Sequence, residues 1–110
     1  MHELAIAEEI IAIVADRTAG ARVGRIVVEI GRLCTVVPDA MRFCFDLATE
    51  GTVAEGARLE IVETPGLGRC RACGAQVVLE RPFGRCGCGG TDLEWLAGEE
   101  LRIKEVELAS

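Results

Sequence analysis

The sequence predicts an α/β fold of the α+β type, in which a small three-stranded sheet packs with two helices and a zinc-ribbon-like module is inserted. Helical and strand periodicity alternate through the first 63 residues, and a last strand pattern returns only after a glycine- and cysteine-rich stretch. A chain of 110 residues, half of them apolar, is sufficient for one core and a small appended module. We therefore expect an α/β domain at residues 1–66, completed by 97–110, and an inserted module at 67–96.

A first helix is predicted between Leu4 and Ala19. Acidic residues occupy one side of this segment, and Gly20 provides a stop signal at its end. Apolar residues recur at helical spacing on the other side, which we expect to be buried: Leu4, Ala7, Ile11, Val14 and Ala15.

A second helix is predicted from Pro38 onward. Proline suits the first helical turn because its missing N–H would have had no partner there, Asp39 suits the helix dipole, and Gly51 can close the end. The expected buried stripe contains Met41, Phe45 and Ala48, with Cys44 and Leu47 beside it.

Three strands complete the predicted sheet. Residues 22–30 alternate between two faces, residues 57–63 are rich in β-branched side chains, and residues 101–108 supply the last strand. In this last strand the apolar phase changes between Ile103 and Val106, which predicts a bulge or a change of face.

The charge of the chain argues against a nucleic-acid partner. With 12 basic and 18 acidic residues the net charge is −6, so the protein's own field would oppose binding to phosphates. Residues 67–96 carry four arginines against three acidic residues, a balance of +1, which leaves −7 on the rest. The sequence contains neither a secretory signal pattern nor an apolar run of membrane-spanning length, so we expect a cytoplasmic protein with no membrane partner.

Six cysteines in a chain without an address to an oxidising compartment favour metal binding over disulfides. Cys70 and Cys73 are separated by two residues, which lets both thiolates reach one ion, and Gly74 permits the tight turn that follows. Together with Cys86 and Cys88 they would close a tetrahedral four-sulfur site. Such a site predicts a structural zinc ion, Zn(II), that stabilises a module too small for its own core.

The second cysteine pair is irregular, because only Gly87 separates Cys86 from Cys88. The glycines around this pair would help the backbone accept a tighter chelate loop. The short spacing leaves open a site completed by water or Asp92, or one that is redox-sensitive. Cys34 and Cys44 fall outside this pattern and are expected to be buried as small apolar side chains.

The N-terminus offers a second type of metal site. The amine of Met1, the amide and the imidazole of His2 can form fused chelate rings, and the amide of Glu3 could add a fourth planar nitrogen. Square-planar nitrogen ligation favours Ni(II) or Cu(II). Amides at the start of the following helix have no intrahelical acceptor, and the Glu3 carboxylate would balance charge near the metal.

In combination these segments resemble the HypA/HybF family of nickel metallochaperones for [NiFe]-hydrogenase maturation. The resemblance covers nearly the whole chain, in order. It rests on Met1-His2-Glu3 before an apolar helix, Glu29-Ile30-Gly31, the segment 37–45, Glu50-Gly51-Thr52, and Cys70-x-x-Cys73.

The resemblance implies a function as well as a fold. It implies transient Ni(II) cargo held by Met1, His2 and Glu3, and structural Zn(II) held by Cys70, Cys73, Cys86 and Cys88. It also implies two partners, a maturation GTPase of the HypB type and the hydrogenase large subunit. We expect no enzymatic activity and a monomer or weak homodimer. The alternative functions are a zinc-ribbon adaptor that only docks proteins and a thiol redox sensor.

Overall fold

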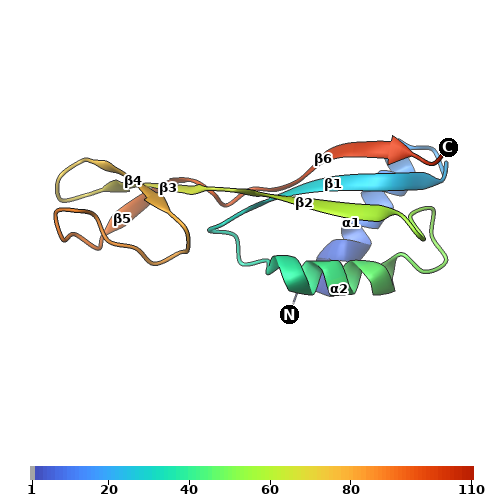
Figure 1. The fold of residues 1–110 in the computed structure, drawn as a ribbon, viewed down its shortest axis with the longest axis horizontal. Helices are drawn as coiled ribbons and strands as arrows, with labels where there is room; N and C mark the ends of the chain where they lie inside the picture. The colour runs from blue at the N-terminus through green and yellow to red at the C-terminus, as the bar shows by residue number, and fades with distance from the viewer. Residues whose placement is uncertain (1) are drawn as a thin grey trace. The chain divides into compact units, whose positions relative to one another are not determined.

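The computed structural model describes residues 2–110, so Met1 lies outside the described residues. Within this range there are two helices and two three-stranded sheets, which confirms the predicted α+β class (Figure 1). The elements are α1 (Glu3–Arg17), β1 (Val23–Gly31), α2 (Pro38–Ala48), β2 (Arg58–Thr64), β3 (Gly66–Cys70), β4 (Gln76–Leu79), β5 (Leu93–Ala97) and β6 (Leu101–Leu108).

The described chain divides into two compact units. The first unit contains residues 1–28, 36–62 and 102–110, and the second contains residues 29–35 and 63–101. Each unit therefore combines segments that are distant in sequence. The predicted division into an α/β domain, 1–66 with 97–110, and an inserted module, 67–96, remains a prediction.

The first sheet has the strand order β2-β1-β6, and α2 connects β1 to its neighbour β2. The last strand runs antiparallel to β1, because the N–H of Ala109 donates to the carbonyl of Arg22 while the N–H of Gly31 donates to that of Glu100. All three predicted strands are thus present, within one residue of their expected bounds. In β6 both Ile103 and Val106 are half-buried, as a change of face would require.

The core of the first unit is aliphatic and closely packed. Its largest fully buried side chains include those of Val14, Ile26, Val28, Met41 and Phe45, which come from both helices and from the central strand. Burying side chains of this size contributes about 1.5 to 3 kcal/mol each. This unit therefore has a hydrophobic core that needs no metal.

Two residues of the predicted helix faces lie outside this core. Leu4 is 42% exposed and Leu47 is 51% exposed, whereas Ile10, which the predicted stripe omitted, is buried. The buried face of helix α1 contains Ala7, Ile10, Ile11 and Val14, and Leu4 lies at the edge of this face.

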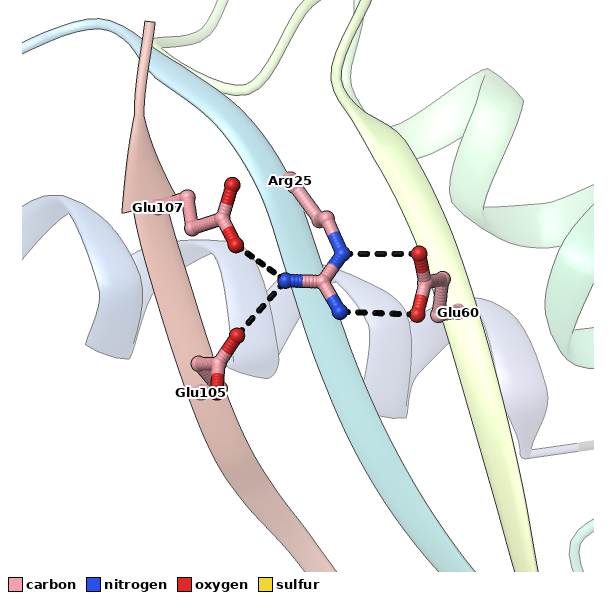
Figure 2. A network of polar contacts seen from close by, with 4 residues as sticks. All are labelled: Arg25, Glu60, Glu105 and Glu107. Atoms are coloured by element: carbon pink, nitrogen blue, oxygen red, sulfur yellow. Dashed lines mark hydrogen bonds and ion pairs between the residues drawn. The ribbon is translucent and has the colours of Figure 1, made fainter.

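Arg25 holds the three strands of the first sheet together on the face turned away from the helices (Figure 2). Its Nε and Nη2 donate to the two carboxylate oxygens of Glu60 on β2, at 2.7 and 2.9 Å, while Nη1 donates to Glu105 at 2.6 Å and to Glu107 on β6. The hydrogen bonds from Arg25 lower the pKa of Glu60. One planar guanidinium therefore connects carboxylates on both neighbouring strands.

The second sheet, with the order β4-β3-β5, was not predicted. Strand β3 pairs antiparallel with both neighbours and begins at Gly66, so that only Pro65 separates it from the end of β2 at Thr64. A Cβ on Gly66 would lie 2.6 Å from the carbonyl oxygen of Leu79 and 2.7 Å from Leu33 Cγ, so close packing requires glycine there.

Candidate metal sites

The four cysteines of the predicted zinc site converge in the second unit. Cys70 is the last residue of β3 and Cys73 lies in the turn after it, while Cys86 and Cys88 come from the turn that precedes β5. Their sulfur atoms all lie within 4.8 Å of one another. The first cysteine of each pair is buried and the second is exposed.

The sulfur distances match the size of a tetrahedral metal site. Cys70 Sγ lies 3.6 Å from Cys88 Sγ, and Cys73 Sγ lies 3.5 Å from Cys86 Sγ. Four sulfurs about 2.3 Å from a central zinc ion would be about 3.8 Å apart. Both of these approaches join one cysteine pair to the other, which is the arrangement of a shared ion.

The two cysteine turns have the same hydrogen-bond pattern at different lengths. In the first, the N–H of Cys70 donates to the carbonyl of Ala75, and Gly74 donates back to the carbonyl of Cys70. In the second, the N–H of Cys86 donates to the carbonyl of Gly90, and the N–H of Gly89 donates to the carbonyl of Cys86. Each bond of the second turn spans one residue fewer, so the one-residue spacing at Gly87 is absorbed within an intact turn.

Two of the three glycines in the second turn are required by its geometry. Gly89 has a φ of 93°, in the left-handed region that favours glycine, as Gly74 does with a φ of 80°. A Cβ on Gly90 would lie 2.9 Å from Cys70 Sγ. Gly87 meets neither condition, since its φ is not in that region and a Cβ there would have no neighbour within 4 Å. Of the glycines expected to help the backbone accept the short spacing, Gly89 and Gly90 are thus required by the geometry and Gly87 is not.

Two of the four thiols, those of Cys70 and Cys73, have shifted pKa values. Backbone N–H groups of Cys73 and Ala72 lower the pKa of Cys70 to about 7. Although the N–H of Ala75 lowers it, the pKa of Cys73 is raised to about 12 by the neighbouring sulfurs of Cys86 and Cys88. The cluster thus favours one thiolate and opposes a second. A divalent cation bound between the sulfurs would supply the positive charge that stabilises further thiolates.

The remaining candidates for this site lie apart from the sulfur cluster. The Oδ1 atom of Asp92 accepts a hydrogen bond from Nε of Arg71 at 3.2 Å, and Asp92 does not belong to the metal-ligand group found within residues 2–110. Cys34 and Cys44 are half-buried free thiols, so their predicted burial is only partial. The sulfur set Cys70, Cys73, Cys86 and Cys88 thus satisfies the geometry without an additional ligand.

At the N-terminus the structure describes two of the three predicted nickel ligands. His2 is the N-cap residue of α1, its side chain is exposed and makes no capping hydrogen bond, and its carbonyl accepts the first helical bond from the N–H of Ile6 at 2.9 Å. The predicted ligand Met1 lies outside the described residues. The imidazole of His2 is therefore accessible at the start of a helix.

Glu3 has a structural role that the sequence did not suggest. Its side chain is only 5% exposed, and Oε2 accepts a hydrogen bond from the N–H of Val37, the N-cap residue of α2, at 3.1 Å. The carboxylate thus joins the beginnings of both helices, where the helix dipoles favour negative charge. The only sequence signal was an acidic residue in the first turn, which does not identify Val37 as the partner.

Comparison with protein families gives one match over almost the entire chain. Residues 1–108 match the family model described as hydrogenase/urease nickel incorporation, metallochaperone, hypA. A hydrogenase maturation factor HypA from Nostoc punctiforme is 56% identical over 108 residues, covering 98% of this chain and 96% of the relative. Another, HypA 2 from Bradyrhizobium diazoefficiens, is 45% identical over 112 residues, covering 98% and 99%.

Solved structures show the same fold. The solution structure of the nickel metallochaperone HypA from Helicobacter pylori superposes with a TM-score of 0.66 at 24% identity, covering 98% of this chain and 97% of the other. A second HypA solution structure superposes with a TM-score of 0.63. Neither α1 nor α2, the helices found in residues 2–110, meets the requirements of a membrane-spanning helix.

Proposed function

The chain belongs to the HypA family of nickel-incorporation metallochaperones, and on that premise we propose that it captures Ni(II) at its N-terminus and delivers it for [NiFe]-hydrogenase maturation. The exposed imidazole of His2 at the start of α1 is the observation that carries this proposal. It is the only histidine of the chain, so any site that needs an imidazole depends on it.

The proposed chelate uses groups that are adjacent in the chain. The Met1 amine, the His2 amide nitrogen and the His2 imidazole form fused five- and six-membered rings, and the Glu3 amide supplies a fourth nitrogen. The first helical hydrogen bond is donated by Ile6, so the amides of His2 and Glu3 precede the helical ladder. Deprotonated amide ligands in a planar set suit Ni(II).

The Glu3 carboxylate contributes charge in this proposal. Because Oε2 is engaged by the N–H of Val37, the side chain is held by the protein instead of being free to ligate. A fixed negative charge next to the site offsets part of the charge of Ni(II). The site thus contains flexible chain-terminal ligands beside a fixed anion.

The four cysteines are proposed to hold zinc for structural reasons. A tetrahedral site closed by four sulfurs has no open position for a substrate, and Cys70 and Cys86 are buried. Zinc would therefore stabilise the inserted module 67–96, and the α/β domain of residues 1–66 and 97–110 would carry the nickel.

Delivery follows from the chemistry of the ligands. Reprotonation or motion of the terminal amine and amides breaks the chelate without unfolding the domain. No catalytic step is needed, in keeping with a metallochaperone family. The proposed partners are a maturation GTPase of the HypB type, which would act with this protein, and the hydrogenase large subunit, which would receive the metal.

Metal analysis of untagged protein with an intact N-terminus tests this function. We expect one tightly held zinc and one exchangeable nickel per chain. His2→Ala, or an extension that blocks the Met1 amine, should abolish nickel binding and leave zinc and the circular dichroism spectrum unchanged, because neither change touches the core or the cysteines.

Glu9→Gln serves as the matched control, since Glu9 is an exposed residue of the same helix. Nickel affinity that survives either N-terminal variant would overturn the site. Nickel binding lost equally in Glu9→Gln would show that helix charge, and not the chelate, controls the affinity.

A further inference from the structure

The second unit carries an open groove beside the cysteine site. It has a volume of about 540 Å³ and is formed by the loop around Phe83 together with the segment from Thr91 to Trp95. Phe83 is 87% exposed and Trp95 on β5 is 39% exposed. Two aromatic side chains therefore remain in contact with water at a concave surface, where they would bury apolar area if a partner docked.

The lining of this groove contains two charged residues, Arg85 and Asp92, and Arg81 lies next to it in the sequence. Arg81 and Arg85 flank Phe83 in the sequence, and neither makes an ion pair with any residue of the described range 2–110. The two acidic residues nearest in sequence to this loop are occupied elsewhere. Glu80 pairs with Arg32 at 2.8 Å and Asp92 pairs with Arg71 at 3.2 Å.

The other arginine of the second sheet belongs to its opposite face. Arg69 is the cross-strand partner of Glu94, whereas the adjacent position pairs Gly68 with Trp95. Since neighbouring residues of a strand point to opposite faces, Arg69 and Glu94 are directed away from the face that carries Trp95. On the groove side, Arg85 is thus left without a carboxylate partner, whereas the lining residue Asp92 is already paired with Arg71.

From this combination we propose that the groove binds an acidic segment of a partner protein that carries an apolar anchor side chain. The anchor packs between Phe83 and Trp95, and carboxylates on either side of it pair with Arg81 and Arg85. Aromatic and arginine side chains are the types that dominate binding energy at protein interfaces. Peptide binding in this groove does not involve nickel, so it can be tested independently of the nickel site proposed at the N-terminus.

The cysteine site would support this groove. Arg85 directly precedes Cys86, and Asp92 and Leu93 follow the second cysteine turn, so the turn positions both ends of the groove wall. In addition, the N–H of Arg71 donates to the carbonyl of Asp92 at 3.0 Å, which ties the two cysteine turns together at the groove. Binding should therefore require the zinc-loaded protein.

The only tryptophan of the chain lies in this groove, which provides an intrinsic probe. A short synthetic peptide with one leucine between glutamates contains no fluorophore, so Trp95 emission alone follows its titration into the zinc-loaded full chain. We expect a saturable shift in emission that weakens with added salt. A peptide with lysines in place of the glutamates, and one with serine in place of the leucine, should not bind.

Matched variants distinguish peptide binding in the groove from non-specific adhesion of the peptide to the protein. Phe83→Ala and Arg85→Gln should each weaken peptide binding about tenfold. Phe43→Ala, which removes another exposed aromatic from α2, and Arg69→Gln, which removes the same charge from the other sheet face, should leave the affinity unchanged.

Three results would overturn the proposal. One is a Trp95 spectrum that does not respond to the acidic peptide, and another is equal binding of the lysine peptide. The third is a change of Trp95 emission when the protein alone is diluted, because the groove would then be covered by a second copy of this chain.

Discussion

The two compact units are built from different amounts of apolar material. The first unit buries side chains from both helices and from β1, including Ile26, Met41 and Phe45. The second unit buries fewer large apolar side chains, those of Ile30, Leu33 and Leu79, together with Cys70 and Cys86. Hydrophobic burial therefore stabilises the first unit, whereas the second unit would gain its stability from the proposed cross-linking through zinc.

Removing one sulfur ligand should have the largest effect and should be confined to the second unit. Cys70→Ser is expected to abolish zinc retention and to unfold residues 66–97, because this unit buries too few apolar side chains to replace the metal. Amide hydrogen exchange should show lost protection in β3, β4 and β5 and retained protection in α1 and β1. Cys44→Ser, on α2, should keep its zinc; loss of protection throughout the chain in Cys70→Ser would contradict the comparison.

Truncating the core of the first unit should have the converse effect. Phe45 is 1% exposed, so Phe45→Ala should lower the free energy of unfolding by about 3 to 5 kcal/mol. Zinc content should remain at one per chain. Phe83→Ala, at a side chain that is 87% exposed, should change stability by only about 0.5 kcal/mol or less in denaturant titrations. Equal losses in both variants would mean that the second unit also depends on its aromatic side chains.

A smaller effect is expected from a single methyl group beside the sulfurs. Gly90→Ala would place a Cβ 2.9 Å from Cys70 Sγ, so zinc affinity should fall about tenfold. Gly87→Ala meets no atom within 4 Å and should leave the affinity unchanged. Competition with a chromogenic chelator measures both. If the two variants have the same zinc affinity, the close approach of Gly90 to the sulfurs does not control zinc binding.

Most of the first unit could be predicted because local signals determine it. Pro38 marks the start of α2, and Gly20, with a φ of 81°, follows the end of α1. The same signals do not specify how a helix is rotated against the sheet. This explains why Leu4, predicted on a buried face, and Leu47, predicted beside one, are both largely exposed.

The second unit was harder to predict because its strands are short and depend on one another. Strand β4 has four residues, and β3 contains three glycines or cysteines among five residues, so neither shows an alternating pattern. Strands β4 and β5 are defined by their pairing with β3 in the centre, which no local sequence signal encodes. The four cysteines could be grouped from their spacing, but the partners of Asp92 and Glu3 are set by tertiary contacts alone.

The shortened turn at Cys86 has a consequence for how such chains are recognised. Its two backbone hydrogen bonds are kept while the loop loses a residue, so what defines the turn is a closed ring of bonds and not a residue count. Sequence searches that demand two residues between every pair of cysteines would discard this chain. A pattern that accepts either spacing, provided that a glycine follows the second cysteine, describes both turns of this chain.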